Sequence, residues 1–131
     1  MDYNRDIRIL YVDDSITIRD MVESALLGLG YLNIQGAEDG VEALELCDSD
    51  EFDFIITDIN MPNMDGITLI QNLRDRLNYA SIPILVLTTE RTIEMKTKGR
   101  EAGATAWMVK PFDQELLHMA ILETIKKVEE E

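Results

Sequence analysis

Short apolar runs alternate with longer amphipathic segments along this chain, and this alternation is the feature that most restricts its fold. The runs have the length of strands rather than helices, and they occupy residues 7–12, 33–37, 52–57, 82–87 and 105–109. Between them, apolar residues recur every three or four positions, which is typical of amphipathic helices. Strands that alternate with helices predict an α/β fold, in which helices cover both faces of a five-stranded parallel sheet.

A helix is predicted after each strand. Ser15 can cap the first helix, and we expect Met21 to be among the buried residues of that helix. Val41 and Leu77 continue the apolar spacing of the second and third helices, so both are predicted to face the core. The fifth helix is predicted over residues 114–128.

The fourth helix, predicted over residues 91–102, differs from the others in composition. It has few apolar residues and contains Gly99, so we predict that it is the least stable element. It also carries a cluster of basic residues, namely Arg91, Lys96, Lys98 and Arg100. This cluster can receive an acidic segment of a partner, or it can be a solvated helix face on which Glu94 pairs with Lys98.

Length and composition indicate one packed domain. The chain has 131 residues, of which 46% are hydrophobic and 29% charged, and we expect a single domain over residues 1–131 with its core at about 7–128. The 26 acidic and 12 basic residues give a net charge of −14, which disfavours binding to nucleic acid or to anionic membranes. No apolar run approaches a membrane span, and the single Cys47 cannot form an internal disulfide, so we expect a cytoplasmic protein. We also expect it to be a monomer.

Polar side chains follow four of the predicted strands at the point where each strand ends. They are Asp13 with Asp14, Asp58, Thr88 and Lys110. Because the carboxyl ends of parallel strands lie at one edge of a sheet, we expect these side chains to share one pocket. Crowded carboxylates oppose one another's ionisation unless a cation joins them, and their oxygens suit Mg²⁺. The pattern predicts a metal-assisted phosphoryl-transfer site, while the alternative is that each aspartate only caps a helix or closes a turn.

Four motifs in a fixed order carry a family resemblance. They are Val12-Asp13-Asp14-Ser15, Thr57-Asp58-Ile59-Asn60-Met61-Pro62-Asn63-Met64-Asp65-Gly66, Leu87-Thr88-Thr89-Glu90 and Val109-Lys110-Pro111-Phe112. In order and spacing they resemble the receiver domain of two-component response regulators, most closely the single-domain CheY type, from about residue 7 to residue 128. The resemblance implies a doubly wound, flavodoxin-like sheet with the strand order 2-1-3-4-5.

The resemblance gives the clustered aspartates separate roles. Asp58 is similar to the phosphoacceptor of the family. Asp13, Asp14 and Asp58 are similar to its metal-binding carboxylates, and the backbone carbonyl of Asn60 to a further Mg²⁺ ligand. An ionised carboxylate can attack phosphorus, and Mg²⁺ together with Lys110 can neutralise the charge on the transferred oxygens.

Residues at the other strand ends resemble the parts that transmit the signal. Thr88 is similar to the switch hydroxyl that follows the phosphoryl group, and Lys110 to its counter-charge. The bond between Lys110 and Pro111 resembles one that is cis in the family, which would direct the ammonium into the pocket. Trp107 occupies the aromatic switch position, where a smaller ring is usual, although a buried tryptophan can also be an ordinary core residue.

Three further residues are expected to tune the loss of the phosphoryl group. Asn60 and Glu90 match the chemotaxis pattern and border the path of attacking water, which implies a short-lived phosphoryl group. Thr89 is bulkier than the small residue that is common beside the switch threonine, so we expect it to hinder the access of water or of the phosphodonor.

The resulting hypothesis is a binding switch operated by phosphorylation. A sensor histidine kinase or a small phosphodonor would load Asp58, and the face of the fourth helix, fifth strand and fifth helix would bind an output protein, with the flagellar motor switch as a candidate and a phosphatase as a further partner. Such a protein is not an enzyme beyond its own phosphorylation and dephosphorylation. The alternatives are a phosphate sink or relay in another pathway, an aspartyl-phosphate hydrolase of haloacid-dehalogenase type and a flavin carrier. The hydrolases resemble an Asp-x-Asp motif that Asp13-Asp14-Ser15 lacks, and no Ser/Thr-rich phosphate loop follows the first strand.

Overall fold

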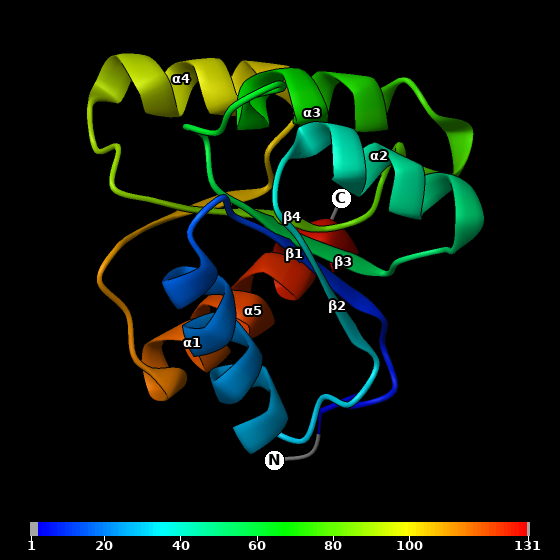
Figure 1. Ribbon diagram of the computed structural model, residues 1–131, viewed down its shortest axis with the longest axis vertical. Helices are drawn as coiled ribbons and strands as arrows, with labels where there is room; N and C mark the ends of the chain where they lie inside the picture. The colour runs from blue at the N-terminus through cyan, green and yellow to red at the C-terminus, as the bar shows by residue number, and fades with distance from the viewer. Residues whose placement is uncertain (1–2, 131) are drawn as a thin grey trace.

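The computed structural model describes residues 3–130, and within them five strands form one parallel sheet (Figure 1). The strands are β1 Ile9–Val12, β2 Ile34–Ala37, β3 Phe54–Thr57, β4 Ile84–Thr88 and β5 Ala106–Val109. Their order across the sheet is β2-β1-β3-β4-β5, and each neighbouring pair is parallel. The predicted α/β class and the strand order that the resemblance implies are therefore confirmed.

Helices cover both faces of this sheet. They are α1 Ile16–Gly28, α2 Gly40–Ser49, α3 Gly66–Arg74, α4 Ile93–Ala102 and α5 Gln114–Glu129, and the 3-10 helix η1 Leu77–Tyr79 follows α3. Helices α1 and α5 lie on one face, whereas α2, α3 and α4 lie on the other (Figure 1). Each α-helix follows a residue whose side-chain oxygen accepts a hydrogen bond from the backbone N–H three positions later; these caps are Ser15, Asp39, Asp65, Thr92 and Asp113. Capping residues in the sequence thus mark where the helices begin.

The hydrophobic core consists of two clusters, one on each face of the sheet. Ile9 and Leu10 are neighbours in β1 yet belong to different clusters, and the same holds for Phe54 and Ile55 in β3. Successive side chains of a strand point to opposite faces, so a strand that is covered on both sides must be apolar throughout. This is why the central strands appear in the sequence as continuous apolar runs.

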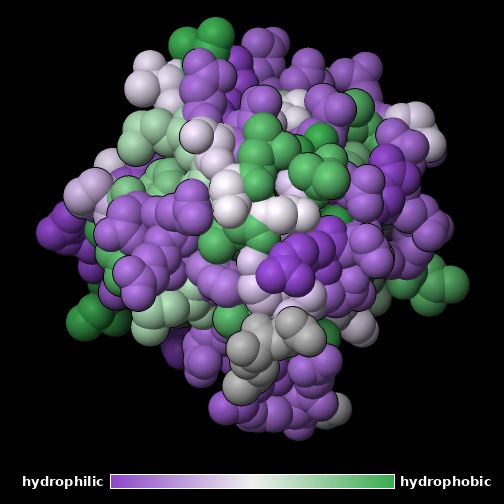
Figure 2. Space-filling view, turned by 90° about the horizontal axis from the view of Figure 1, so that it is seen from below, coloured by the Kyte–Doolittle hydropathy of each residue, from purple (hydrophilic) through white to green (hydrophobic). Residues whose placement is uncertain are grey.

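The outer surface is mixed in character. Seen from below, hydrophilic side chains dominate, and hydrophobic ones show between them (Figure 2). In the part of the chain that the structure describes, no helix combines the length and the apolar character that crossing a bilayer requires.

The predicted position of Leu77 in the core is wrong. Leu77 is 97% exposed, because α3 ends at Arg74 and Leu77 starts the separate helix η1. The buried face of α3 ends with Leu73, and Tyr79 fills the space beyond it. The hydroxyl of Tyr79 also accepts a hydrogen bond from the backbone N–H of Phe52, which ties η1 to the start of β3.

Met21 and Val41 were also predicted to face the core, and both are 43% exposed. On α1 the buried positions are Val22, Ala25 and Leu26, so Met21 lies at the margin of the apolar stripe. On α2 the buried side chains are those of Ala43 and Cys47, and Val41 lies on the flank of the first turn. An apolar residue at the edge of the apolar face of a helix can match the helical spacing and still be exposed to solvent.

Three strands start two residues later than their apolar runs. Ile7, Phe52 and Ile82 begin the runs, but the strands begin at Ile9, Phe54 and Ile84. Before β1, the N–H of Arg8 donates to the carboxylate of Asp53. Before β4, Pro83 has no N–H to donate to a neighbouring strand. Side-chain contacts and proline therefore shorten these strands at their amino ends.

The strand register brings the polar strand ends together. Val12 pairs with Thr57, Thr57 with Val86, and Thr88 with Val109. Thr88, the last residue of β4, therefore lies at the carboxyl edge of the sheet beside the residues that follow Val12, Thr57 and Val109. Those residues are Asp13, Asp58 and Lys110, so this edge is the position of the candidate site.

Candidate functional site

Three carboxylates converge where β1 and β3 end. Asp13, Asp14 and Asp58 each contribute an oxygen atom, and these atoms all lie within 4.8 Å of one another. Asp13 and Asp58 are buried, whereas Asp14 is exposed at the mouth of the group. The cluster is therefore held by the sheet on one side and open to solvent on the other.

Lys110 provides the positive charge of this cluster. Its Nζ atom lies 2.7 Å from Oδ2 of Asp13 and 2.9 Å from Oδ2 of Asp58. All three side chains are nearly enclosed, with exposed fractions of 10% for Lys110, 7% for Asp13 and 11% for Asp58. The peptide bond between Lys110 and Pro111 is cis, as the resemblance implies.

The surroundings shift the pKa values of the two buried carboxyl groups, Asp13 and Asp58, in opposite directions. Burial raises the pKa of Asp13, although hydrogen bonds from Lys110 and from the N–H of Ser15 oppose the shift. Burial has the same effect on Asp58, but hydrogen bonds from the Thr88 hydroxyl, from Lys110 and from the N–H of Ile59 outweigh it and lower the pKa of this carboxyl. Asp58 is therefore ionised at neutral pH, which is the form that a nucleophile needs.

Lys110 is held in its charged form by the same contacts. Burial by itself would lower the pKa of its ammonium group, but the hydrogen bonds and charges of Asp13 and Asp58 raise it above its usual value. A permanent cation thus lies beside both buried carboxylates.

Asp13 and Asp58 also close turns, as aspartates often do, but each uses only one carboxylate oxygen for this. Oδ1 of Asp13 accepts from the N–H of Ser15 at 2.9 Å, and Oδ1 of Asp58 accepts from the N–H of Ile59 at 2.6 Å. The second oxygen of each group, Oδ2, contacts Lys110. The local hydrogen bonds therefore orient the carboxylates and leave one oxygen of each for the shared pocket.

The donor set fits a hard divalent cation. Mg²⁺ prefers carboxylate and carbonyl oxygens, and the cluster offers carboxylates from Asp13, Asp14 and Asp58. Asn60 follows Asp58 by two residues in the loop before α3, and its backbone carbonyl is the predicted fourth protein ligand. The acidic cluster can thus hold a metal ion.

The loop between β3 and α3 is fastened at two points that the sequence motifs did not explain. The side-chain amide of Asn63, which has a φ angle of 67°, donates to Oδ2 of Asp39 at 2.7 Å. At Gly66, a Cβ atom would lie 2.1 Å from the carbonyl oxygen of Asp58, so only glycine allows this close approach. The sequence motifs did not point to Asp39. The feature that could have revealed it is its position directly before Gly40, where an aspartate can cap α2.

Predicted switch and tuning residues form a chain of contacts at the end of β4. The N–H of Glu90 donates to the Thr88 hydroxyl at 3.3 Å, and the side-chain amide of Asn60 donates to Oε1 of Glu90 at 2.9 Å. The indole Nε1–H of Trp107 donates to the backbone carbonyl of Glu90 at 2.9 Å. Thr88 is fully buried and Trp107 half-buried, whereas Thr89 is exposed. The geometry therefore connects Asn60, Glu90 and Trp107 and leaves Thr89 outside this chain.

Comparison with known proteins gives the family of this fold and site. Residues 9–122 match the response regulator receiver domain. A curated relative, chemotaxis protein CheY-3 of Vibrio cholerae, is 40% identical over 109 residues, which are 83% of this chain and 84% of that protein. The solved structure of the chemotaxis response regulator CheY4 of Vibrio cholerae is 43% identical, has a TM-score of 0.86, and is matched over 91% of this chain and 98% of its own.

A second solved structure bears on the acidic cluster. The receiver domain of a sensor histidine kinase of Pseudomonas aeruginosa, described with a magnesium ion coordinated in its active-site cleft, is 26% identical and has a TM-score of 0.84. The match covers 92% of this chain and 98% of that one. The chain belongs to the response regulator receiver domain family and is of the CheY-like type.

Proposed function

We propose that this protein is a phospho-accepting response regulator in which phosphorylation of Asp58 changes the affinity for a downstream partner. The observation that carries the proposal is the environment of Asp58: an ionised carboxylate with one oxygen held by a backbone N–H and the other 2.9 Å from the ammonium of Lys110. Two further carboxylates stand beside it. Membership of the receiver family and the likeness to chemotaxis proteins support the same role.

The proposed chemistry is a phosphoryl transfer to Asp58. An oxygen of its carboxylate forms a bond to phosphorus while the bond between phosphorus and the donor's nitrogen or oxygen atom breaks, and the leaving group retains the electron pair. Lys110 lies where it can stabilise the negative charge of the transferred group. A magnesium ion held by Asp13, Asp14, Asp58 and the Asn60 carbonyl would supply further positive charge there. We infer that the protein catalyses only this transfer and the later hydrolysis of the acyl phosphate. In that hydrolysis a water oxygen bonds to phosphorus, the Asp58 carboxylate leaves with the electron pair, and inorganic phosphate is released.

The switch and tuning roles are proposed for the residues that follow β4. Thr88 contacts Asp58 through its hydroxyl and can donate to a phosphoryl oxygen on that residue instead. Asn60 and Glu90 are hydrogen-bonded to each other, and the N–H of Glu90 donates to the Thr88 hydroxyl. We propose that these two side chains border the path of the water that attacks phosphorus. Thr89 is exposed, and we propose that its side chain hinders the access of water or of the phosphodonor.

The proposed partner surface is the face of α4, β5 and α5. It carries a groove of about 220 Å³, lined by Lys96, Arg100, Ala104, Thr105, Ala106, Trp107 and Lys127. On the exposed side of α4, Lys98 pairs with Glu94 at 3.6 Å, so the basic residues of this helix serve two surfaces. In a chain with a net charge of −14, three cations around one tryptophan favour an acidic partner segment with an apolar residue. By analogy with the chemotaxis relatives, the flagellar motor switch is the proposed output partner and a histidine kinase the phosphodonor, in the cytoplasm.

The experiment that tests this function is radiolabelling with acetyl phosphate. We expect one Mg²⁺-dependent phosphoryl group per chain, lost in Asp58→Asn and in the presence of a chelator. Asp75→Asn is a matched control, because Asp75 is an exposed carboxylate at the far end of α3. Equal labelling of wild type and Asp58→Asn would contradict the proposal.

A further inference from the structure

Gly99 lies in the middle of α4 and is the one buried residue of this helix. A Cβ atom built on Gly99 would lie 2.5 Å from Cζ3 of Trp107, 3.0 Å from Cε3 and 3.6 Å from Cη2. These three atoms belong to the six-membered ring of the indole. The ring therefore rests directly on the backbone of α4, in space that any side chain at position 99 would fill.

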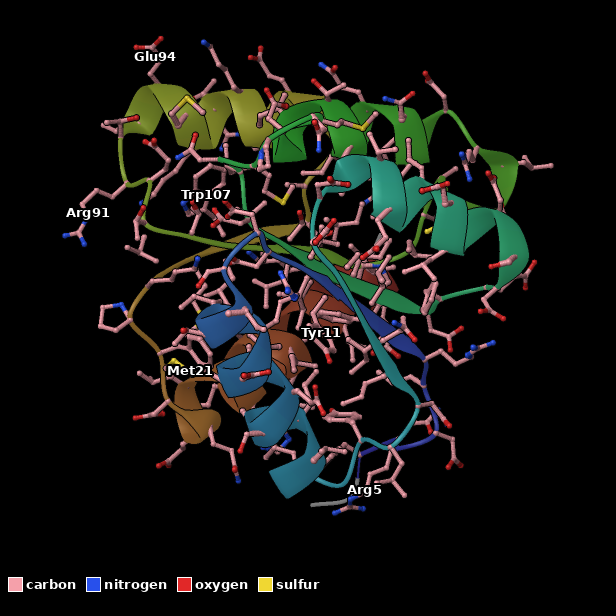
Figure 3. All side chains as sticks on the ribbon, viewed as in Figure 1. Arg5, Tyr11, Met21, Arg91, Glu94 and Trp107 are labelled. Carbon is pink, nitrogen blue, oxygen red and sulfur yellow. The ribbon has the colours of Figure 1, made fainter. Side chains whose placement is uncertain are left out.

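The indole is held at its other end by a hydrogen bond. Nε1 donates to the backbone carbonyl of Glu90 at 2.9 Å, in the loop between β4 and α4. Trp107 projects from β5 toward the face of the sheet that α4 covers (Figure 3). Its position is thus defined by two contacts, one with the start of this loop and one with the middle of α4.

The backbone of Gly99 does not itself require glycine. The glycines with positive φ angles among the described residues are Gly30 and Gly103, and Gly99 is not one of them. Within a helix, glycine is less favourable than alanine by about 1 kcal/mol. Met95 and Ala102 of α4 are only partly buried against the core, and the Trp107 indole occupies the space beside position 99. The contact with this indole is therefore the physical reason in this structure for a glycine at this position.

We propose that Gly99 is the positioning residue of the aromatic switch: it forms a seat on α4 that accepts the indole of Trp107. With the seat open, the indole bonds to the carbonyl of Glu90 and lies back against α4. With a methyl group in the seat, the ring must leave and this hydrogen bond is lost. The consequence for partner binding rests on the proposed function, because the groove that Trp107 lines is on the proposed partner surface.

A double-mutant cycle in urea denaturation tests the seat. Helix propensity alone predicts that Gly99→Ala raises the unfolding midpoint. The seat predicts the reverse in wild type, because the new methyl group displaces the indole, and it predicts a raised midpoint in the Trp107→Ala background, where the space is free. If Gly99→Ala does not fold, the comparison of Trp107→Ala with the double variant still decides the matter, since stabilisation in that pair assigns the loss to the indole. Equal stabilisation by Gly99→Ala in both backgrounds would overturn the proposal.

Tryptophan fluorescence tests the seat independently, because a change in stability alone would not change the emission of the folded protein. Trp107 is the only tryptophan, so its emission reports on this seat without labelling. In the unphosphorylated, folded protein, Gly99→Ala should shift the emission to longer wavelength and increase quenching by acrylamide. Acetyl phosphate labelling of Asp58 separates the two proposals: intact labelling with an unchanged spectrum refutes the seat alone. If wild type is not labelled but the emission of Gly99→Ala is shifted, the phosphorylation switch is refuted and the seat stands.

Discussion

Helices α3 and α4 lie side by side on the same face of the sheet, yet they are attached to it in opposite ways (Figure 1). Helix α3 buries Leu69, Ile70 and Leu73 completely. Helix α4 covers no large side chain completely: its Met95 is only partly buried against the core, and its backbone receives the indole of Trp107. Helix α3 follows the loop that carries Asn60, whereas α4 bounds the groove that is lined by Lys96, Arg100 and Lys127. A receiver needs a fixed pocket and an adjustable partner surface, and these neighbouring helices meet the two requirements with different amounts of buried apolar surface.

The largest expected effect concerns the apolar attachment of these helices. Leu73→Ala should lower the free energy of unfolding by about 2–5 kcal/mol, because it removes a fully buried side chain and leaves a cavity. Ile93→Ala in α4 should change it by less than about 0.5 kcal/mol, because Ile93 is 84% exposed. Urea denaturation measures both variants. Similar losses would show that α4 is anchored as firmly as α3.

Mg²⁺ binding at the carboxylate cluster, which precedes the loop to α3, should stabilise the folded protein. Mg²⁺ that binds only the folded protein should add about 2.7 kcal/mol to the free energy of unfolding at 100 times its dissociation constant. Asp14→Asn should raise the stability of the metal-free protein, by relieving repulsion among carboxylates, and should weaken the Mg²⁺ effect. Thermal denaturation with and without Mg²⁺ gives both quantities, with Asp20→Asn, an exposed carboxylate on α1, as control. An unchanged Mg²⁺ response in Asp14→Asn would remove Asp14 from the metal site.

A smaller, pH-dependent effect is expected at Asp39, which supports the loop before α3. Hydrogen bonds from the N–H of Glu42 and the amide of Asn63 lower the pKa of Asp39. A carboxyl whose pKa is lower in the folded state stabilises the protein above its unfolded value of about 3.9, and this contribution is lost as the pH falls through the folded value. Asp39→Ala should cost about 1 kcal/mol at pH 7, and progressively less in acid. A stability difference that does not depend on pH would assign the loss to packing instead of to the charge.

The smallest effect is expected from the ion pair on the outer surface of α4. Glu94 and Lys98 are 3.6 Å apart, with side chains 79% and 57% exposed. Glu94→Gln should lower the free energy of unfolding by about 0.3–0.5 kcal/mol at low salt and by less at high salt. Urea denaturation at two ionic strengths measures it. A loss that persists in concentrated salt would mean that Glu94 packs against the helix and does more than pair with Lys98.

The amino-acid sequence by itself determined the alternation of strands and helices, the cap of the first helix and the residues that meet at the carboxyl edge. Asp13, Asp58, Thr88 and Lys110 could be named in advance, because each follows an apolar run and parallel strands end at a common edge. Caps such as Ser15 depend on backbone groups only three residues away. The order of the strands required the family likeness, because periodicity does not say which strands are neighbours.

The tertiary structure alone decided how those residues are used. It joined Asp39 to Asn63 and Glu90 to Trp107, placed Leu77 in solvent, and set the Trp107 indole on the backbone of Gly99. In the sequence, Gly99 indicated only a weak helix. Such contacts link elements far apart in the chain, and they depend on how whole helices pack on the sheet. Short-range spacing carries no information about that packing, so the pocket could be predicted from the sequence, whereas the seat of the tryptophan could not.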